Sequence, residues 1–227
     1  MTIRRRMILL GWVKRITTSL PPSWQQELKR LYFRRQIRRE QFVSDEAEFT
    51  DLDQYVSEGA LVLDIGANVG HYTKRLSELV GATGRVIALE PVPATFALLV
   101  ANASLFKHQN VTLINAAASS ENGIVNMSLP IHNGSVNFYQ AAISDGGGVQ
   151  VMALALDSIH IGRVAFVKMD VEGHEAEAIE GLKETLERDR PTLLVETFST
   201  RGAIQRLTDM GYMGTHATGS PNWIFRR

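Results

Sequence analysis

Short apolar runs alternate with amphipathic segments along most of the chain after residue 60. The runs indicate buried strands. The segments between them repeat their apolar residues every three or four positions, which is typical of helices. This alternation predicts an α/β protein with a mostly parallel, doubly wound sheet. The predicted strands are 61–65, 85–90, 111–115, 164–170 and 192–197, with helices over 94–106 and 202–210 and a final hairpin of 212–215 and 223–227 on the sheet edge.

The pattern changes between residues 119 and 151. Shorter strand-like pieces, 124–129, 136–139 and 149–154, are separated by polar and glycine-rich stretches. We interpret residues 120–154 as a β insertion beside the ligand crevice. Such loops carry substrate specificity more often than core stability.

Residues 1–44 form a separate, basic segment. They contain eleven Lys or Arg and two Glu, a charge of +9, so the remaining residues carry −9. The apolar run 7–13 follows three arginines, and it is interpreted either as a peripheral membrane anchor or as part of a packed basic helix. We therefore divide the chain into a helical extension, 1–44, and a main domain, 45–227.

Two helices are expected before the first strand. Ser23 and Gln26 have the spacing of a capping box, which predicts a helix from there to about residue 41. One face of that helix is apolar and is expected to dock on the domain behind it: Trp24, Leu28, Leu31 and Tyr32. A shorter helix over 45–58 presents the apolar residues Phe49, Leu52 and Val56.

Composition narrows the class of protein. The hydrophobic content of 44% is typical of a globular protein. Without cysteine the chain has no disulfides and no thiolate metal sites, which fits a cytoplasmic protein. No apolar run approaches the roughly 20 residues of a membrane span.

A glycine turn follows the first strand and organises the rest of the chain. Gly66 and Gly70 lie between the strand and a helical pattern, where glycine lets the backbone approach a ligand closely. The spacing is not the G-x-G-x-x-G of dinucleotide-binding proteins. Asp64 precedes the turn and would repel a pyrophosphate, but it suits the sulfonium and amino groups of S-adenosylmethionine. A purely structural turn is the alternative.

Four acids fall at the carboxyl ends of predicted strands: Asp64, Glu90, Asp170 and Glu196. These ends line the crevice of a doubly wound sheet. Glu90 ends the second strand, where a carboxylate can accept both hydroxyl groups of a ribose. The alternative for Glu90 is a capping residue before the helix that begins near Pro91.

The turn Asp64-x-Gly-Ala-Asn-x-Gly, the Glu90-Pro91 pair and the element Lys168-Met-Asp170-Val-Glu172-Gly-His174-Glu resemble the FkbM-type S-adenosylmethionine-dependent methyltransferases. The resemblance covers about residues 45–200. It implies the class I methyltransferase fold, a Rossmann-like, mostly parallel sheet of seven strands. It also implies transfer of a methyl group to a hydroxyl of a sugar, natural product or other small molecule, with S-adenosylhomocysteine as the second product.

The resemblance assigns positions to the cofactor. The glycine turn would hold the methionine portion, Glu90 the ribose, and residues 117–120 the adenine; many similar methyltransferases have an Asp at about Ser120. The expected cofactor residues are Asp64, Gly66, Ala67, Asn68, Gly70, Tyr72, Glu90, Pro91, Ala117, Ala118, Ser119 and Asp170. Asp157 lies in a further family-like element and is interpreted as a structural cap.

Catalysis on a hydroxyl needs a base or a metal ion. The candidate catalytic residues are Asp170, Glu172, His174, Lys168 and Glu196, with His71 as a further histidine on the rim. Lys168 alternates with Asp170 along its strand, so both face the same side. Lys168 then either pairs with Glu172 or Glu196 or contacts the substrate.

A divalent metal would have Asp170 and Glu196 as ligands. We favour catalysis without a metal, because Lys168 already supplies a cation. A small-molecule or glycan acceptor is expected and a nucleic acid is not, since an acidic rim repels phosphates. N- or C-methylation, or a non-catalytic binding module that uses the basic segment, are the alternatives. The charge of residues 1–44 also suggests their contact with an anionic membrane or an acidic partner.

Overall fold

The computed structural model describes residues 21–129, 131–132, 135–136, 142–144, 146, 148–197, 202–217 and 219–227. The apolar run 7–13 and most of the strand predicted over 136–139 lie outside these residues. None of the helices in the described part combines the length and the apolar content that crossing a bilayer requires.

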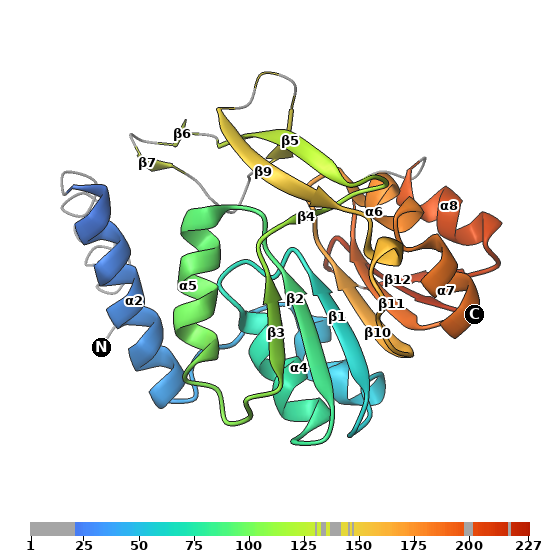
Figure 1. Ribbon diagram of the computed structural model, residues 1–227. Coiled ribbons are helices and arrows are strands. Elements are labelled where there is room, and N and C mark those ends of the chain that lie inside the picture. Colours follow the sequence, from blue (N-terminus) through green and yellow to red (C-terminus); the bar gives the residue numbers. More distant parts are fainter. Residues whose placement is uncertain are drawn as a thin grey trace.

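A seven-stranded sheet forms the centre of the molecule (Figure 1). Its order is β12-β13-β11-β10-β1-β2-β3, and the five strands from β11 to β3 are parallel, while β13 runs antiparallel to both neighbours. This confirms the predicted fold class. The strands are β1 (Leu61–Ile65), β2 (Arg85–Leu89), β3 (Val111–Ile114), β10 (Val164–Met169), β11 (Thr192–Glu196), β12 (Met213–His216) and β13 (Asn222–Arg226).

Helices cover both faces of the sheet, because alternate strand residues point to opposite sides. Val62 of β1 packs toward Leu76 of helix α4, whereas Leu63 packs toward Ile179 and Leu186 on the other face. The helices of the first face are α4 (His71–Val80) and α5 (Pro93–Ala103), and those of the second are α6 (Glu175–Glu180), α7 (Lys183–Asp189) and α8 (Ala203–Asp209).

The predicted β insertion forms a second sheet of order β4-β9-β5-β8. Figure 1 shows β5 and β9 above the carboxyl ends of β1 and β2. The insertion therefore lies over the edge of the central sheet at which ligands bind in this fold. Its strands are β4 (Ala117–Ala118), β5 (Gly123–Ser128), β8 (Ala142–Ile143) and β9 (Val149–Leu154), and β6 (Ile131–His132) pairs separately with β7 (Ser135–Val136).

Helix α2 (Pro22–Arg38) begins without the predicted capping box. Its N-cap residue is Pro21, and no side chain caps the first turn. The side-chain amide of Gln26 instead donates a 2.8 Å hydrogen bond to the carbonyl oxygen of Ala94, at the start of α5. The Gln26 side chain therefore bonds to α5 and does not cap the first turn of α2.

The face of α2 that docks on the domain is also not the predicted one. Phe33 and Ile37 are buried and pack with Phe42 and with residues of α5. The four residues expected to dock are exposed, by between 41% and 65%: Trp24, Leu28, Leu31 and Tyr32. Phe33 and Ile37 are one helical turn apart and lie opposite that set, so the two faces cannot dock on the same surface.

The helix expected over 45–58 is split into α3 (Ala47–Thr50) and a 3₁₀ turn, η1 (Asp51–Gln54). The three apolar residues predicted for it, Phe49, Leu52 and Val56, are buried against β1 and α4. The prediction for the core therefore holds, although the backbone of this segment is less regular.

Candidate active site

The glycine turn between β1 and α4 is held by backbone contacts on two sides. The N–H groups of Gly66 and Ala67 donate to the carbonyl oxygen of Leu89, at 3.0 and 2.8 Å. Gly66 has φ +79°, and a Cβ atom there would lie 1.7 Å from the carbonyl oxygen of Asp170. Gly70 has φ +99°, and its Cβ would lie 2.7 Å from Leu99. Both positions require glycine.

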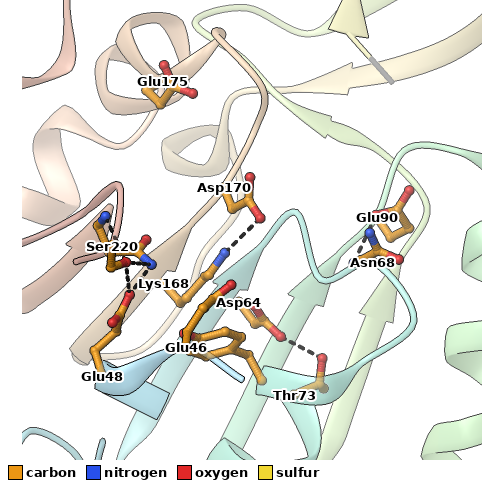
Figure 2. A network of polar contacts seen from close by, with 12 residues as sticks. Glu46, Glu48, Asp64, Asn68, Thr73, Glu90, Lys168, Asp170, Glu175 and Ser220 are labelled. Carbon is orange, nitrogen blue, oxygen red and sulfur yellow. Dashed lines mark hydrogen bonds and ion pairs between the residues drawn. The ribbon is translucent and has the colours of Figure 1, made fainter. Parts of the chain in front are cut away.

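Glu90 reaches from the end of β2 to this turn. One carboxylate oxygen accepts the N–H of Asn68 at 3.0 Å, and the other accepts the N–H of Val92 at 2.9 Å (Figure 2). Burial raises the pKa of the Glu90 carboxyl to about 7, although these two hydrogen bonds oppose the shift. A carboxylate has about four acceptor positions, so two remain for the hydroxyl groups of a ribose.

Asp64 lies beneath the turn and is fully buried. One carboxylate oxygen accepts a 2.5 Å hydrogen bond from the Thr73 hydroxyl, whereas the other has no partner among the described residues. Burial raises the pKa of the Asp64 carboxyl to about 6, against the attraction of Lys168. An unpaired buried acceptor of this kind fits a cationic ligand, because a charged donor would satisfy it.

Lys168 is the buried cation of the site. Its Nζ lies 3.1 Å from Asp170 Oδ2 and 5.0 Å from the centre of the Tyr72 ring, and Figure 2 shows it directed toward Asp170. Burial alone would lower the pKa of Lys168, but Asp170, Asp64 and Glu196 together raise it. The ion-pair partner is thus Asp170 rather than the predicted Glu172 or Glu196, because residues two apart on a strand share a face.

A pocket opens at the carboxyl ends of the strands, beneath the insertion. Nine predicted site residues line it: Gly66, Asn68, Glu90, Pro91, Ala117, Ala118, Asp170, Glu172 and His174. The other predicted residues are not part of its lining: Asp64, Ala67, Gly70, Tyr72, Ser119, Lys168 and Glu196. Asp64 and Lys168 lie behind the lining, where they hold the turn and Asp170 in place.

Five lining residues were missed from the sequence: Val92, Ala116, Met127, Ile143 and Val171. Val92, Ala116 and Val171 are close in sequence to predicted residues. Met127 and Ile143 come from β5 and β8 of the insertion and face each other in the register of that pair. The insertion itself was predicted beside the crevice, but its pattern did not indicate which residues face inward.

The two histidines considered for catalysis lie in different surroundings. His174 lines the pocket, where its Nε2 is 3.1 Å from the Ser119 hydroxyl and burial lowers its pKa. His71 instead stacks on Phe42 at 4.0 Å, beneath helix α2, and burial lowers its pKa to about 4. His71 therefore belongs to the contact that docks α2, and Ser119 positions His174.

Acidic side chains gather beside Asp170. Burial and then the charge of Asp170 raise the pKa of the Glu196 carboxyl to about 7. Glu46, which the sequence did not indicate, accepts a hydrogen bond from the Tyr72 hydroxyl and adds to the negative potential at Glu196. In the described part of the chain, no group of three or more His, Cys, Asp or Glu is arranged to hold a metal ion.

Asp157 caps a helix, as predicted. It lies in the 3₁₀ turn η3 (Leu156–Ser158), and its carboxylate accepts the backbone N–H groups of Glu184 and Thr185 and the Thr185 hydroxyl, at 2.6 to 3.1 Å. These bonds satisfy free N–H groups in the first turn of α7.

The sheet order, the glycine turn and the acid at the end of β2 together define a class I methyltransferase, and the unpaired oxygen of Asp64 and the spare acceptor positions of Glu90 fit S-adenosylmethionine. A family model described as the methyltransferase FkbM domain matches residues 64–213. The chain belongs to this family and is an S-adenosylmethionine-dependent methyltransferase.

Solved structures share the fold. An FkbM methyltransferase from Methylobacillus flagellatus KT matches with a TM-score of 0.56 and 16% identity, over 75% of this chain and 44% of that one, so this chain spans less than half of that protein. Precorrin-6y C5,15-methyltransferase from Geobacter metallireducens GS-15 matches with a TM-score of 0.50 and 18% identity, over 81% and 88%. Fibrillarin from Aeropyrum pernix, with natively bound S-adenosyl-L-methionine, matches with a TM-score of 0.50 and 16% identity, over 76% of this chain and 68% of that one. No curated protein matches significantly.

Proposed function

We propose that the chain transfers a methyl group from S-adenosylmethionine to a hydroxyl of a small molecule, such as a sugar or natural product. The observation that carries this proposal is the group of carboxylates at the ends of β10 and β11. Asp170 lines the pocket and is paired with Lys168, and Glu196 is the last residue of the neighbouring strand β11, with a carboxyl pKa of about 7. A hydroxyl acceptor needs such a base, because it is a poor nucleophile until its proton is drawn away.

The cofactor, when bound, supplies an electrophilic methyl group on a sulfonium. The chain's own residues would bind and align the two reactants, which supplies much of the acceleration in a displacement of this kind. Glu90 would accept the ribose hydroxyl groups, and Asp64, from behind the lining, would attract the positive charge of the cofactor. Met127 and Ile143 of the insertion would cover the pocket and exclude water.

Proton transfer completes the reaction. A C–O bond forms as the C–S bond breaks, and the hydroxyl proton must leave the acceptor oxygen. We assign Asp170 to orient the hydroxyl as a hydrogen-bond acceptor and Glu196 to take the proton. A base with a pKa near the working pH combines a large ionised fraction with useful basicity. Lys168 would hold the Asp170 carboxylate in place through their ion pair.

No metal ion is needed in this scheme. Lys168 supplies the positive charge beside Asp170 that a divalent ion would otherwise supply. Activity should therefore survive treatment with a chelator. Loss of activity in chelator, restored by magnesium or manganese, would instead establish a metal site that includes Asp170.

The test is a methyl-transfer screen. The protein is incubated with S-adenosylmethionine that carries a labelled methyl group, together with sugars, glycans, phenols, amines and a small-molecule extract of the source cells. Mass spectrometry then locates the label. A methyl ether that forms much more slowly with Asp170→Asn supports the proposal, provided that calorimetry shows retained cofactor binding in that variant. Label found only on nitrogen or carbon contradicts O-methylation.

A further inference from the structure

Helix α2 carries large apolar side chains on the surface that points away from the domain. Trp24, Leu28, Leu31 and Tyr32 are 65%, 41%, 53% and 56% exposed. Their spacing of three and four residues places them on one face of the helix, opposite the buried Phe33 and Ile37. We call these four residues the outer face of α2. A continuous exposed apolar surface of this kind marks an interaction site more often than scattered single residues do.

Arginines continue the same side of the helix toward its C-terminal end. Arg34, Arg35, Arg38 and Arg39 surround a shallow depression together with Leu31 and Tyr32, and all four are exposed. No carboxylate among the described residues lies within ion-pair distance of these four guanidinium groups. Arg30, in contrast, is 3.5 Å from Glu27. We include these four arginines in the outer face from here on, so that it is apolar in its first half and positively charged in its second.

The helix holds this surface in a fixed orientation. Phe33 and Ile37 pack into the cluster with Phe42, and Gln26 bonds the carbonyl oxygen of Ala94. Figure 1 shows α2 standing beside α5, with its first turns on the side of the molecule where the insertion lies. The outer face is therefore presented next to the end of the sheet at which the pocket opens.

We propose that the outer face of α2 binds an anionic lipid bilayer. Arg34, Arg35, Arg38 and Arg39 complement the phosphates of the headgroups, and each basic residue near such a surface strengthens binding about fivefold. Trp24 and Tyr32 are the side chains that settle at the level of the headgroups, while Leu28 and Leu31 enter the boundary with the acyl chains. Apolar and basic residues on one helix face are together typical of helices that lie in the membrane surface.

Two other occupants fit the surface less well. An RNA strand would use the arginines and the aromatic rings, but it offers nothing to Leu28 and Leu31. A second copy packed antiparallel about a two-fold axis would lay the exposed arginines of each α2 against the apolar half of the other, which would desolvate their charges without supplying a carboxylate. An anionic bilayer satisfies both halves of the face at once.

The experiment is co-sedimentation of the full chain with vesicles of phosphatidylcholine, alone and mixed with phosphatidylglycerol. We expect binding to the mixed vesicles at low salt, weakened by higher salt because exposed charges are screened. The double variant Arg35→Gln, Arg38→Gln should bind at least tenfold more weakly, from the contribution of two basic residues. Leu28→Ser with Leu31→Ser should weaken binding by at least the same factor.

Matched controls lie on other faces. Arg163→Gln with Lys183→Gln removes two exposed charges, and Met213→Ser removes an exposed apolar side chain, so these variants should bind like the unchanged protein. Vesicles with brominated acyl chains should quench part of the tryptophan fluorescence. Trp24→Phe should keep binding but lose the part of that quenching that Trp24 contributes beside Trp12 and Trp223, because Phe preserves the apolar contact and removes one fluorophore.

Three outcomes would overturn the proposal. The first is no binding to mixed vesicles at low salt. The second is binding that the α2 variants leave unchanged, which would assign it to another part of the chain. The third is that the protein does not sediment with vesicles but instead binds a single-stranded RNA, or forms a dimer seen by light scattering, through these side chains.

Discussion

The carbonyl oxygen of Asp170 lies 1.7 Å from the position that a Cβ atom would take at Gly66. The backbone after β10 therefore crosses the backbone after β1 with no space for a side chain. The N–H of Asp170 also donates to the carbonyl oxygen of Ile65, at 2.9 Å. This crossing joins the glycine turn to the carboxylate that we propose orients the acceptor, so a disturbance of one should reach the other.

Gly66→Ala should be among the most damaging single changes to this site. The φ of +79° at residue 66 costs any L-residue about 1–2 kcal/mol, and relief of the clash with Asp170 costs about 1–3 kcal/mol more. Gly59 is a matched control, since it has the same φ of +79° but only an ordinary 3.6 Å contact at its Cβ position. In denaturant unfolding, Gly59→Ala should lower the free energy of unfolding by only about 1–2 kcal/mol, which is the cost of the positive φ. Equal losses of unfolding free energy in the two variants would mean that the backbone near Asp170 shifts to admit the Cβ atom at little cost.

Glu90 should make cofactor binding depend on pH. Its carboxyl pKa is about 7 in the free protein, and the ionised form accepts the stronger, charge-assisted hydrogen bonds from the ribose hydroxyl groups. Affinity for S-adenosylhomocysteine should therefore rise as the pH increases through 7. Glu90→Gln should lower the affinity at least tenfold, through loss of a charge-assisted hydrogen bond of about 1.5–3 kcal/mol, and should flatten this dependence. Calorimetry measures both, with the exposed Glu121→Gln as control.

The same shift has a consequence for stability. The folded protein holds the Glu90 proton more tightly than the unfolded chain does, because burial raises its pKa from the ordinary carboxyl value of 4.5 to about 7. The contribution of Glu90 to the free energy of unfolding should thus fall as the pH rises from about 4.5 to about 7. Glu90→Gln should reduce that slope in the free protein. A slope that is unchanged in the variant would contradict the raised pKa.

Asp157 should matter for stability and not for binding. Asp157→Ala removes the acceptor for two N–H groups and one hydroxyl at the start of α7, which should cost about 1–2 kcal/mol. Asp157→Asn keeps one acceptor oxygen and should lose less. Calorimetry well below the unfolding temperature should give an unchanged affinity for S-adenosylhomocysteine. A weakened affinity in a folded variant would give Asp157 a part in the site.

Much of the sheet could be predicted because its strands are buried on both faces. Such strands are continuous apolar runs, and β1, β2, β10 and β11 begin at the predicted residues. The strand-end residues followed directly, since parallel strands bring their carboxyl ends to one edge. Glu90 and Asp170 line the pocket for this reason.

Other features depend on packing between distant segments. Helix α2 has two apolar faces, and only the shape of the surface beside α5 decides that Phe33 docks and Leu28 does not. Glu46 lies in a loop, and its place near Glu196 follows from the path of the chain before β1. Local pattern contains neither of these relationships, so they could not be predicted from the sequence.

Glu196 should set the pH dependence of methyl transfer. A base must be ionised, and the pKa of the Glu196 carboxyl is about 7, so turnover on the hydroxyl acceptor found by the screen should rise with pH through 7. Glu196→Gln should lower turnover by about 10²–10⁴-fold and remove this rise. The exposed Glu187→Gln is the matched control and should leave the profile unchanged.

Asp170→Asn separates the two carboxylates. After burial, the charge of Asp170 is the next cause of the raised pKa at Glu196, and Lys168 opposes it. Removing that charge also frees Lys168 from its ion pair, so both effects lower the pKa of Glu196. The residual turnover of Asp170→Asn should therefore rise at a lower pH than that of the unchanged protein. If Asp170 itself were the base, its loss would abolish the rise of turnover with pH instead of moving it. The pH at which the turnover of Asp170→Asn rises therefore decides which carboxylate takes the proton.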